Sequence, residues 1–98
     1  MTETLRVVAH LKAKPGKEEE LQRLLCGLIE PTHKEAGCLE YRLYGNKADA
    51  RDLTFVEEWE SDAALDAHLA TPHLEEAISK MPALLEGDPD IRRYRLIA

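Results

Sequence analysis

Hydrophobic and polar residues alternate in the first part of the chain. Within residues 4–13, one side of an extended segment would carry Leu5, Val7, Ala9 and Leu11, and the other Arg6, Val8, His10 and Lys12. This period of two is typical of a β-strand with one buried face. Pro15 and Gly16 follow and end the predicted strand.

The next segment changes to a helical period. Apolar residues recur at spacings of three and four, at Leu21, Leu24, Leu25, Leu28 and Ile29. We therefore predict a helix over residues 17–35. Pro31 should kink or interrupt it, because proline lacks a backbone N–H and clashes with the preceding turn. Gly37 fits the end of the helix.

Alternation returns in two segments that predict an antiparallel hairpin. Residues 38–44 place Leu39, Tyr41 and Leu43 on one face, and residues 53–60 alternate again. The segment between them, residues 45–52, is rich in turn-forming residues.

A second helical region and a last strand complete the pattern. Ser61 is a suitable N-cap for a short helix, and Thr71 followed by Pro72 predicts that the helix breaks and restarts there. Proline and glycine mark a loop over residues 82–89, and residues 91–97 predict a final strand.

The order strand, helix, strand, strand, helix, strand predicts an α+β, ferredoxin-like βαββαβ fold. In this fold a four-stranded antiparallel sheet carries helices on one face. A length of 98 residues fits one domain over residues 1–98. The alternation assigns to the uncovered face Val8, His10, Glu40, Arg42, Val56, Glu58, Arg93 and Arg95. A free, solvent-exposed surface can show this mixture, but valines among opposite charges also suit a two-fold interface, and we expect a homodimer.

Composition excludes several classes of partner. The formal net charge is -6 and the basic residues are scattered, which argues against nucleic acid. No apolar run approaches the roughly 20 residues that span a bilayer, and the N-terminus does not resemble a signal peptide. We expect a cytoplasmic protein with no membrane partner. Cys26 and Cys38 are expected to be free thiols, and the Cys and His spacing predicts no metal site.

Glu57 is the most informative candidate for chemistry. It shares a strand face with Phe55 and Trp59, so we expect it to project toward the helices. Burial would raise its pKa and prepare it for proton transfer or for hydrogen bonding to a ligand. The alternative is a structural ion pair near the sheet rim with Arg92 or Lys80.

Two histidines follow in the second helical region. His68 lies on an apolar helical stripe with Leu65 and should face the sheet, either as a functional group or as a satisfied core residue. Its spacing predicts that it shares one cavity with Glu57 and Trp59. His73 stands at a helix start, where backbone N–H groups bind anions, or is simply exposed.

Tyr41 and Tyr94 are expected to bring phenol groups to the same cavity from the second and last strands. The chain contains no phosphate-binding glycine loop, nucleotide fingerprint, GxSxG elbow or HExxH pair. Any chemistry must therefore use side chains and the substrate itself.

Three segments resemble antibiotic biosynthesis monooxygenase domains, including bacterial quinol monooxygenases. They are VVAHLKAKPGKEEEL (residues 7–21), EAGCLEYRLY (35–44) and FVEEWESDAALDAHLATPH (55–73). The third is the most similar, with family positions matched by Glu57, Trp59, Ala64, Leu65, His68, Pro72 and His73. The resemblance implies a dimeric α+β barrel, formed through the open sheet face, with a pocket in each subunit.

The resemblance also implies oxidation of a small phenol or quinol by O₂ without metal, flavin or nicotinamide. His68 or Glu57 would remove the substrate's proton. The substrate-binding residues would be Trp59, Tyr41, Phe55, His73 and Tyr94. Ile78 stands where haem-degrading relatives carry a histidine ligand, which argues against haem.

Two other functions fit the same residues. One is isomerisation of a small phosphorylated metabolite, which would require cationic groups in the pocket. Arg92 is the only arginine that we predict on the core face. The other is binding of a small molecule without chemistry.

Overall fold

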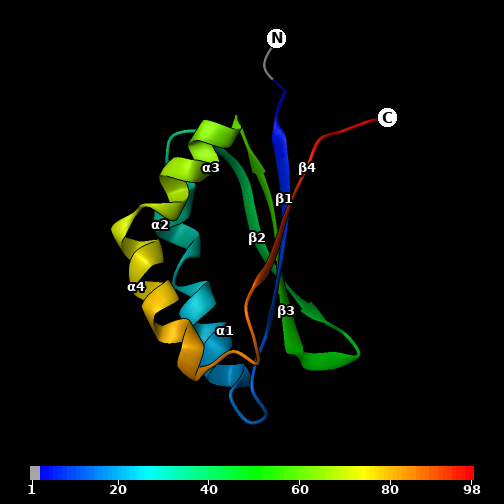
Figure 1. The fold of residues 1–98 in the computed structure, drawn as a ribbon, viewed down its shortest axis with the longest axis vertical. Helices are drawn as coiled ribbons and strands as arrows, with labels where there is room; N and C mark the ends of the chain where they lie inside the picture. The colour runs from blue at the N-terminus through cyan, green and yellow to red at the C-terminus, as the bar shows by residue number, and fades with distance from the viewer. Residues whose placement is uncertain (1–2) are drawn as a thin grey trace.

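The computed structural model describes residues 3–98 as one sheet with all helices on the same face (Figure 1). The elements are β1 (Leu5–Lys12), α1 (Glu18–Cys26), α2 (Ile29–His33), β2 (Cys38–Asn46), β3 (Asp49–Trp59), α3 (Asp62–Leu69), α4 (Pro72–Lys80), the 3₁₀ turn η1 (Met81–Ala83) and β4 (Asp90–Tyr94). The strand order is β2-β3-β1-β4, and every neighbouring pair is antiparallel. This confirms the predicted ferredoxin-like fold.

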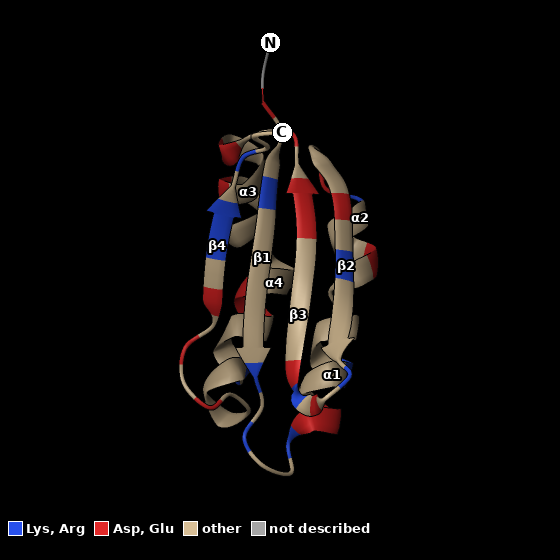
Figure 2. Ribbon diagram, turned by 90° about the vertical axis from the view of Figure 1, so that its right-hand side faces the viewer, with Lys and Arg blue, Asp and Glu red and all other residues tan. Residues whose placement is uncertain are grey.

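The uncovered face of the sheet, which is turned toward the viewer in Figure 2, carries rows of apolar and charged side chains across the strands. The central row across the four strands is Arg42, Val56, Val8 and Arg92. In the row above it, Glu40 lies opposite Glu58 on the neighbouring strand. The Arg6 guanidinium lies 3.2 Å from Glu40 Oε1 and 3.8 Å from Glu58 Oε2. This arginine offsets the repulsion between the two carboxylates.

The prediction for the faces of the last strand is wrong. Arg92 pairs with Val8 on the open face, and Arg93 pairs with Val7 on the helix face. Tyr94, the next residue, pairs with Arg6 and therefore lies on the open face. Adjacent arginines carry no period of two, so the hydrogen-bonded partner strand set the register.

The first helical region contains the predicted interruption, but it lies before the proline. α1 ends at Cys26 and α2 begins at Ile29. A proline ring clashes with the carbonyl four residues earlier, which here belongs to Gly27. The chain therefore breaks at Gly27, and Pro31 lies in the first turn of α2, where no N–H is needed.

A β-bulge exchanges the faces of two residues at the start of β2. Cys38 pairs with Trp59 and Glu40 with Glu58, which leaves Leu39 as the extra residue. Leu39 is 54% exposed, so its predicted core position is wrong. Cys38 instead packs against the core, and its burial raises the thiol pKa to about 11.

Gly37 brings the loop after α2 close to α3. Its φ of 84° lies in the left-handed region, and a Cβ atom there would lie 2.7 Å from the Ala64 side chain. Only glycine combines this conformation with this approach. The loop that carries Glu35 is thereby held against the helix that carries His68.

No helix within residues 3–98 is long and apolar enough to cross a membrane.

Candidate functional site

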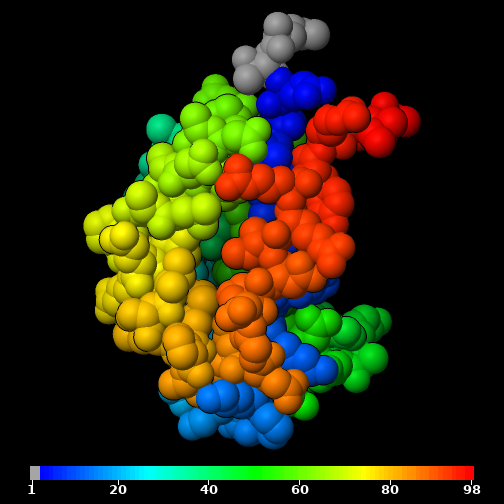
Figure 3. Space-filling model, viewed as in Figure 1, coloured from blue at the N-terminus to red at the C-terminus, as the bar shows by residue number. Residues whose placement is uncertain are grey.

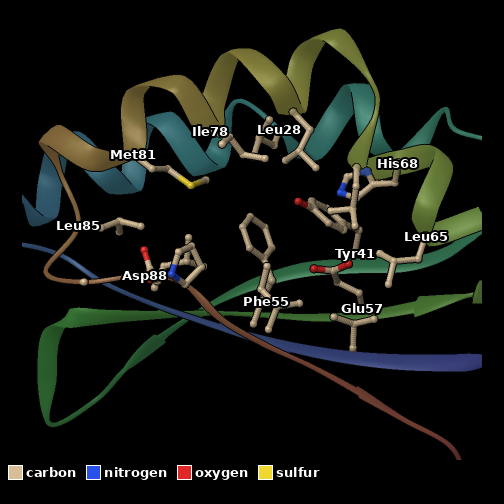
Figure 4. A pocket seen from close by; sticks show the side chains of 18 of the residues that line it. Leu28, Tyr41, Phe55, Glu57, Leu65, His68, Ile78, Met81, Leu85 and Asp88 are labelled. Atoms are coloured by element: carbon tan, nitrogen blue, oxygen red, sulfur yellow. The ribbon is translucent and has the colours of Figure 1, made fainter.

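A cavity of about 430 Å³ lies between the helix face of the sheet and the α3–α4–η1 segment. The molecular surface is hollowed between α4 and β4 (Figure 3). Most lining side chains are apolar: Val7, Ala9, Leu11, Leu28, Phe55, Leu65, Leu69, Leu74, Ile78, Met81, Pro82, Leu85, Pro89 and Ile91. Tyr41, Glu57 and His68 gather at one end, whereas Asp88 lies at the other (Figure 4). No lysine or arginine lines it within residues 3–98.

Glu57 projects from β3 into this cavity and is only 5% exposed. Its carboxylate accepts a 2.8 Å hydrogen bond from Trp59 Nε1. Desolvation raises the pKa of Glu57 to about 7; the Trp59 hydrogen bond lowers it, and the charge of Glu35 raises it. The rim alternative is wrong, because Arg92 pairs with Asp90 and Lys80 with Glu76.

Trp59 supports the polar end without lining the cavity. Its side chain is fully buried, and its ring centroid lies 4.7 Å from that of His68. The indole therefore forms the wall behind Glu57 and His68. We expected Trp59 to contact a bound molecule. In the structure its indole N–H instead donates a hydrogen bond that orients Glu57.

Two aromatic rings of the predicted set do line the cavity. Tyr41 and Phe55 are stacked, with centroids 4.6 Å apart, and Tyr41 meets the His68 ring edge-on at 5.4 Å. Burial, with the nearby Glu57 charge, raises the pKa of Tyr41, which keeps the phenol protonated as a hydrogen-bond donor. Tyr94 is 45% exposed on the open sheet face and does not reach the cavity, because of the register of β4.

His68 and His73 meet at one carboxylate, that of Glu35. His68 Nδ1 lies 2.9 Å from Glu35 Oε2, and His73 Nε2 lies 2.7 Å from the same oxygen. His68 lines the cavity and His73 does not. Burial lowers the pKa of His68, while the hydrogen bond and charge of Glu35 raise it. His73 is thus a partner of Glu35 and not the free anion-binding residue considered above.

Sequence reasoning missed Glu35. It follows α2 in an irregular loop, two residues before Gly37, and no periodicity assigns its side chain to a face. Its separation from His68 is 33 residues. Only the closure of the loop against α3 brings the two together.

The buried acid predicts a pH dependence of stability. The pKa of Glu57 is about 7 in the folded state and 4.5 in the unfolded chain. The folded state therefore binds the proton more tightly, and the stability that this contributes is fully present below pH 4.5 and is lost as the pH rises toward about 7. Glu57→Gln should remove up to about 3 kcal/mol of this dependence. Urea unfolding at pH 5 and pH 8 measures it. Glu75→Gln, at an exposed site, should keep the wild-type difference; equal pH dependence in both variants would contradict the assignment.

Fold and cavity together define a ferredoxin-like protein with an internal, largely apolar site. A model described as antibiotic biosynthesis monooxygenase matches residues 4–80. The chain belongs to this family.

Individual proteins are similar to this chain over most of its length. An uncharacterized Synechocystis protein, sll1783, is 37% identical over 90 residues, which cover 92% of this chain and 61% of that protein. This chain thus spans about three fifths of that relative. The Escherichia coli protein named "Probable quinol monooxygenase YgiN" is 30% identical in an alignment of length 80 that covers 71% of this chain and 77% of that protein. The crystal structure of PA3566 from Pseudomonas aeruginosa superposes with a TM-score of 0.94 at 35% identity, covering 100% and 98% of the two chains.

Proposed function

We propose that the protein is a monooxygenase that oxidises a small, neutral phenol or quinol with O₂, with Glu57 and His68 as its proton-transfer groups. The observation that carries the proposal is the convergence of Tyr41, Glu57 and His68 at one end of a largely apolar cavity. The family match and the printed name of the Escherichia coli relative support it.

The charges around the cavity favour a neutral substrate. Glu57 and Asp88 are its carboxyl groups, and no cation among residues 3–98 lines it. Binding a phosphate would require arginine, lysine or a helix N-terminus directed at it. The Arg92 that would have served an isomerase of phosphorylated metabolites pairs with Asp90 outside the cavity. The geometry therefore favours an aromatic substrate packed against Phe55.

The reaction begins with removal of the phenolic proton. His68 accepts it, because burial keeps the imidazole neutral and its ring reaches the cavity. The Tyr41 hydroxyl donates a hydrogen bond to the phenolate. Glu57, whose pKa lies near 7, exchanges a proton with the second polar group of the substrate.

The oxidation balances without another co-reactant. The phenolate passes one electron to O₂, and the resulting radical and superoxide combine to form a carbon–oxygen bond at a ring C–H. The peroxide takes back the proton held by His68. Cleavage of the O–O bond, with loss of the ring hydrogen, releases water and leaves a quinone carbonyl. One oxygen atom enters the product and the other leaves as water.

Oxygen uptake tests this function. The purified protein is incubated with hydroquinones and naphthoquinols, and O₂ consumption is compared with that of heat-denatured protein. We expect consumption above the spontaneous rate for at least one compound, with a quinone product that has gained one oxygen atom. No excess with any compound, together with saturable binding of the same compounds, would replace the proposal with a binding function.

We also propose that two copies pair through the open sheet face. Val8 and Val56 are half-buried at its centre, between Arg42 and Arg92. The family resemblance adds that such domains form dimeric barrels. A two-fold contact would cover the valines and place the flanking charges at its edge.

Val56→Lys tests the pairing. The wild type should elute as a dimer in size-exclusion chromatography with light scattering. The variant should be monomeric, because burying an unpaired charge at each of two symmetric positions weakens association by about 3 kcal/mol or more. Ala67→Lys, on the exposed side of α3, is the control and should remain dimeric. A monomeric wild type would overturn this proposal.

A further inference from the structure

We propose that Glu35 is a positioning residue that holds a proton on His68 Nδ1 and so leaves His68 Nε2 as the free base facing the cavity. This inference rests on the proposed function, in which His68 accepts the substrate's proton. Glu35 itself does not line the cavity.

The hydrogen bonds determine which nitrogen carries the proton. Glu35 Oε1 and Oε2 lie 3.1 and 2.9 Å from His68 Nδ1. A carboxylate only accepts, so Nδ1 must be the donor. A neutral imidazole with hydrogen on Nδ1 has its lone pair on Nε2. Within residues 3–98, Nε2 of His68 makes no hydrogen bond, which leaves it available to a bound molecule.

The carboxylate is itself held in place from a second side. His73 donates from Nε2 to Glu35 Oε2 at 2.7 Å, and the Thr71 hydroxyl donates to the His68 carbonyl at 2.7 Å. Side-chain exposure falls from 26% at His73 to 13% at Glu35 and 3% at His68. The three residues form a chain from the surface to the cavity. Its outer member fixes Glu35, and Glu35 fixes the ring of His68.

His68 lies among buried side chains, so the charge of Glu35 strongly affects its protonation. The groups packed around His68 are Tyr41 from β2, Trp59 from β3, Glu35 from the α2–β2 loop and His73 from α4. Glu57 from β3 lines the same end of the cavity. When His68 takes a proton, the imidazolium lies in a poorly hydrated site, where a fixed carboxylate stabilises it more than water-exposed charges would. Glu35 thus supports both the starting tautomer and the charged product.

Long-range ¹H–¹⁵N NMR of the imidazole rings tests the tautomer without any substrate. At pH 7.5, wild-type His68 should show a protonated Nδ1 and an unprotonated Nε2, and His73 should carry a proton on Nε2. In Glu35→Leu, which removes the acceptor, His68 should become a mixture of tautomers. Glu35→Gln should retain the tautomer through its amide oxygen. The signals of His10 and His33 serve as internal controls in the same spectra.

Turnover supplies a second readout. With a substrate found by oxygen uptake, Glu35→Leu should lower kcat about 100-fold and Glu35→Gln about 10-fold, with KM changed less than twofold, because Glu35 does not line the cavity. Glu30→Leu and Glu30→Gln are matched controls on the exposed side of α2 and should behave as wild type. Thermal unfolding of each variant verifies that it is folded.

The two readouts separate the two ideas. A wild-type His68 protonated on Nε2, or a tautomer that Glu35→Leu leaves unchanged in a folded variant, would overturn the positioning role. An unchanged kcat in Glu35→Leu would do the same. Absence of oxidation with every compound would refute the proposed reaction, and the tautomer measurement would still decide the role of Glu35.

Discussion

His68→Gln is expected to lower the rate of substrate oxidation by about 10²- to 10⁴-fold, the range that general-base catalysis contributes. The substitution keeps a polar side chain of similar length but removes the group that accepts a proton at neutral pH. Because His68 lines the cavity beside Tyr41 and Glu57, the substrate's hydroxyl can reach it directly. Oxygen consumption under substrate saturation gives kcat, and spectroscopic titration gives binding.

The control for this prediction is His33→Gln. His33 is an exposed residue of α2, and its Nε2 lies 3.0 Å from the Tyr41 carbonyl oxygen, a hydrogen bond that glutamine can also make. It should retain wild-type kcat. If His68→Gln also retained it, the base would have to be Glu57, and Glu57→Gln would then show the large loss.

Trp59→Ala is expected to destabilise the fold by about 3–5 kcal/mol, the range for deleting a buried large aromatic side chain. Trp59 is fully buried, packs against His68 and gives Glu57 its hydrogen bond. The variant therefore creates a cavity and leaves a buried carboxyl group without its donor. Urea unfolding at pH 7 measures the loss.

Two further variants separate the contributions. Trp59→Phe retains most of the packing and removes the indole N–H, so it should cost less than Trp59→Ala. Leu39→Ala should cost less than about 1 kcal/mol, because Leu39 is 54% exposed at the bulge of β2. A loss at Leu39 as large as that at Trp59 would contradict the bulge and restore the face predicted by alternation.

Much of the candidate site was predictable where the sequence has a clear period. Phe55, Glu57 and Trp59 occupy alternate positions of one strand, and their shared inward face is confirmed. The position of His68 on a helical stripe with Leu65 likewise placed it toward the sheet. At Trp59 the pattern correctly gave burial, but it could not distinguish a residue on the cavity surface from one in the wall behind it.

The remaining errors in the sequence-based prediction occur where the local pattern of apolar and polar residues has no clear period. The paired arginines of β4 provide no alternation, so the face of Tyr94 depended on pairing with β1. The bulge at Leu39 and the position of Glu35 depend on how a loop packs against other elements.

The sequence by itself determined the order of strands and helices, the ferredoxin-like fold and the inward face of β3. The reason is that hydrophobic periodicity is a local property of the chain, and burying the apolar face that it creates stabilises the fold. Only the tertiary structure decided the register of β4 and the meeting of Glu35, His68 and His73. Those contacts join residues far apart in the chain, and their distances follow from packing and strand pairing, which no local pattern encodes.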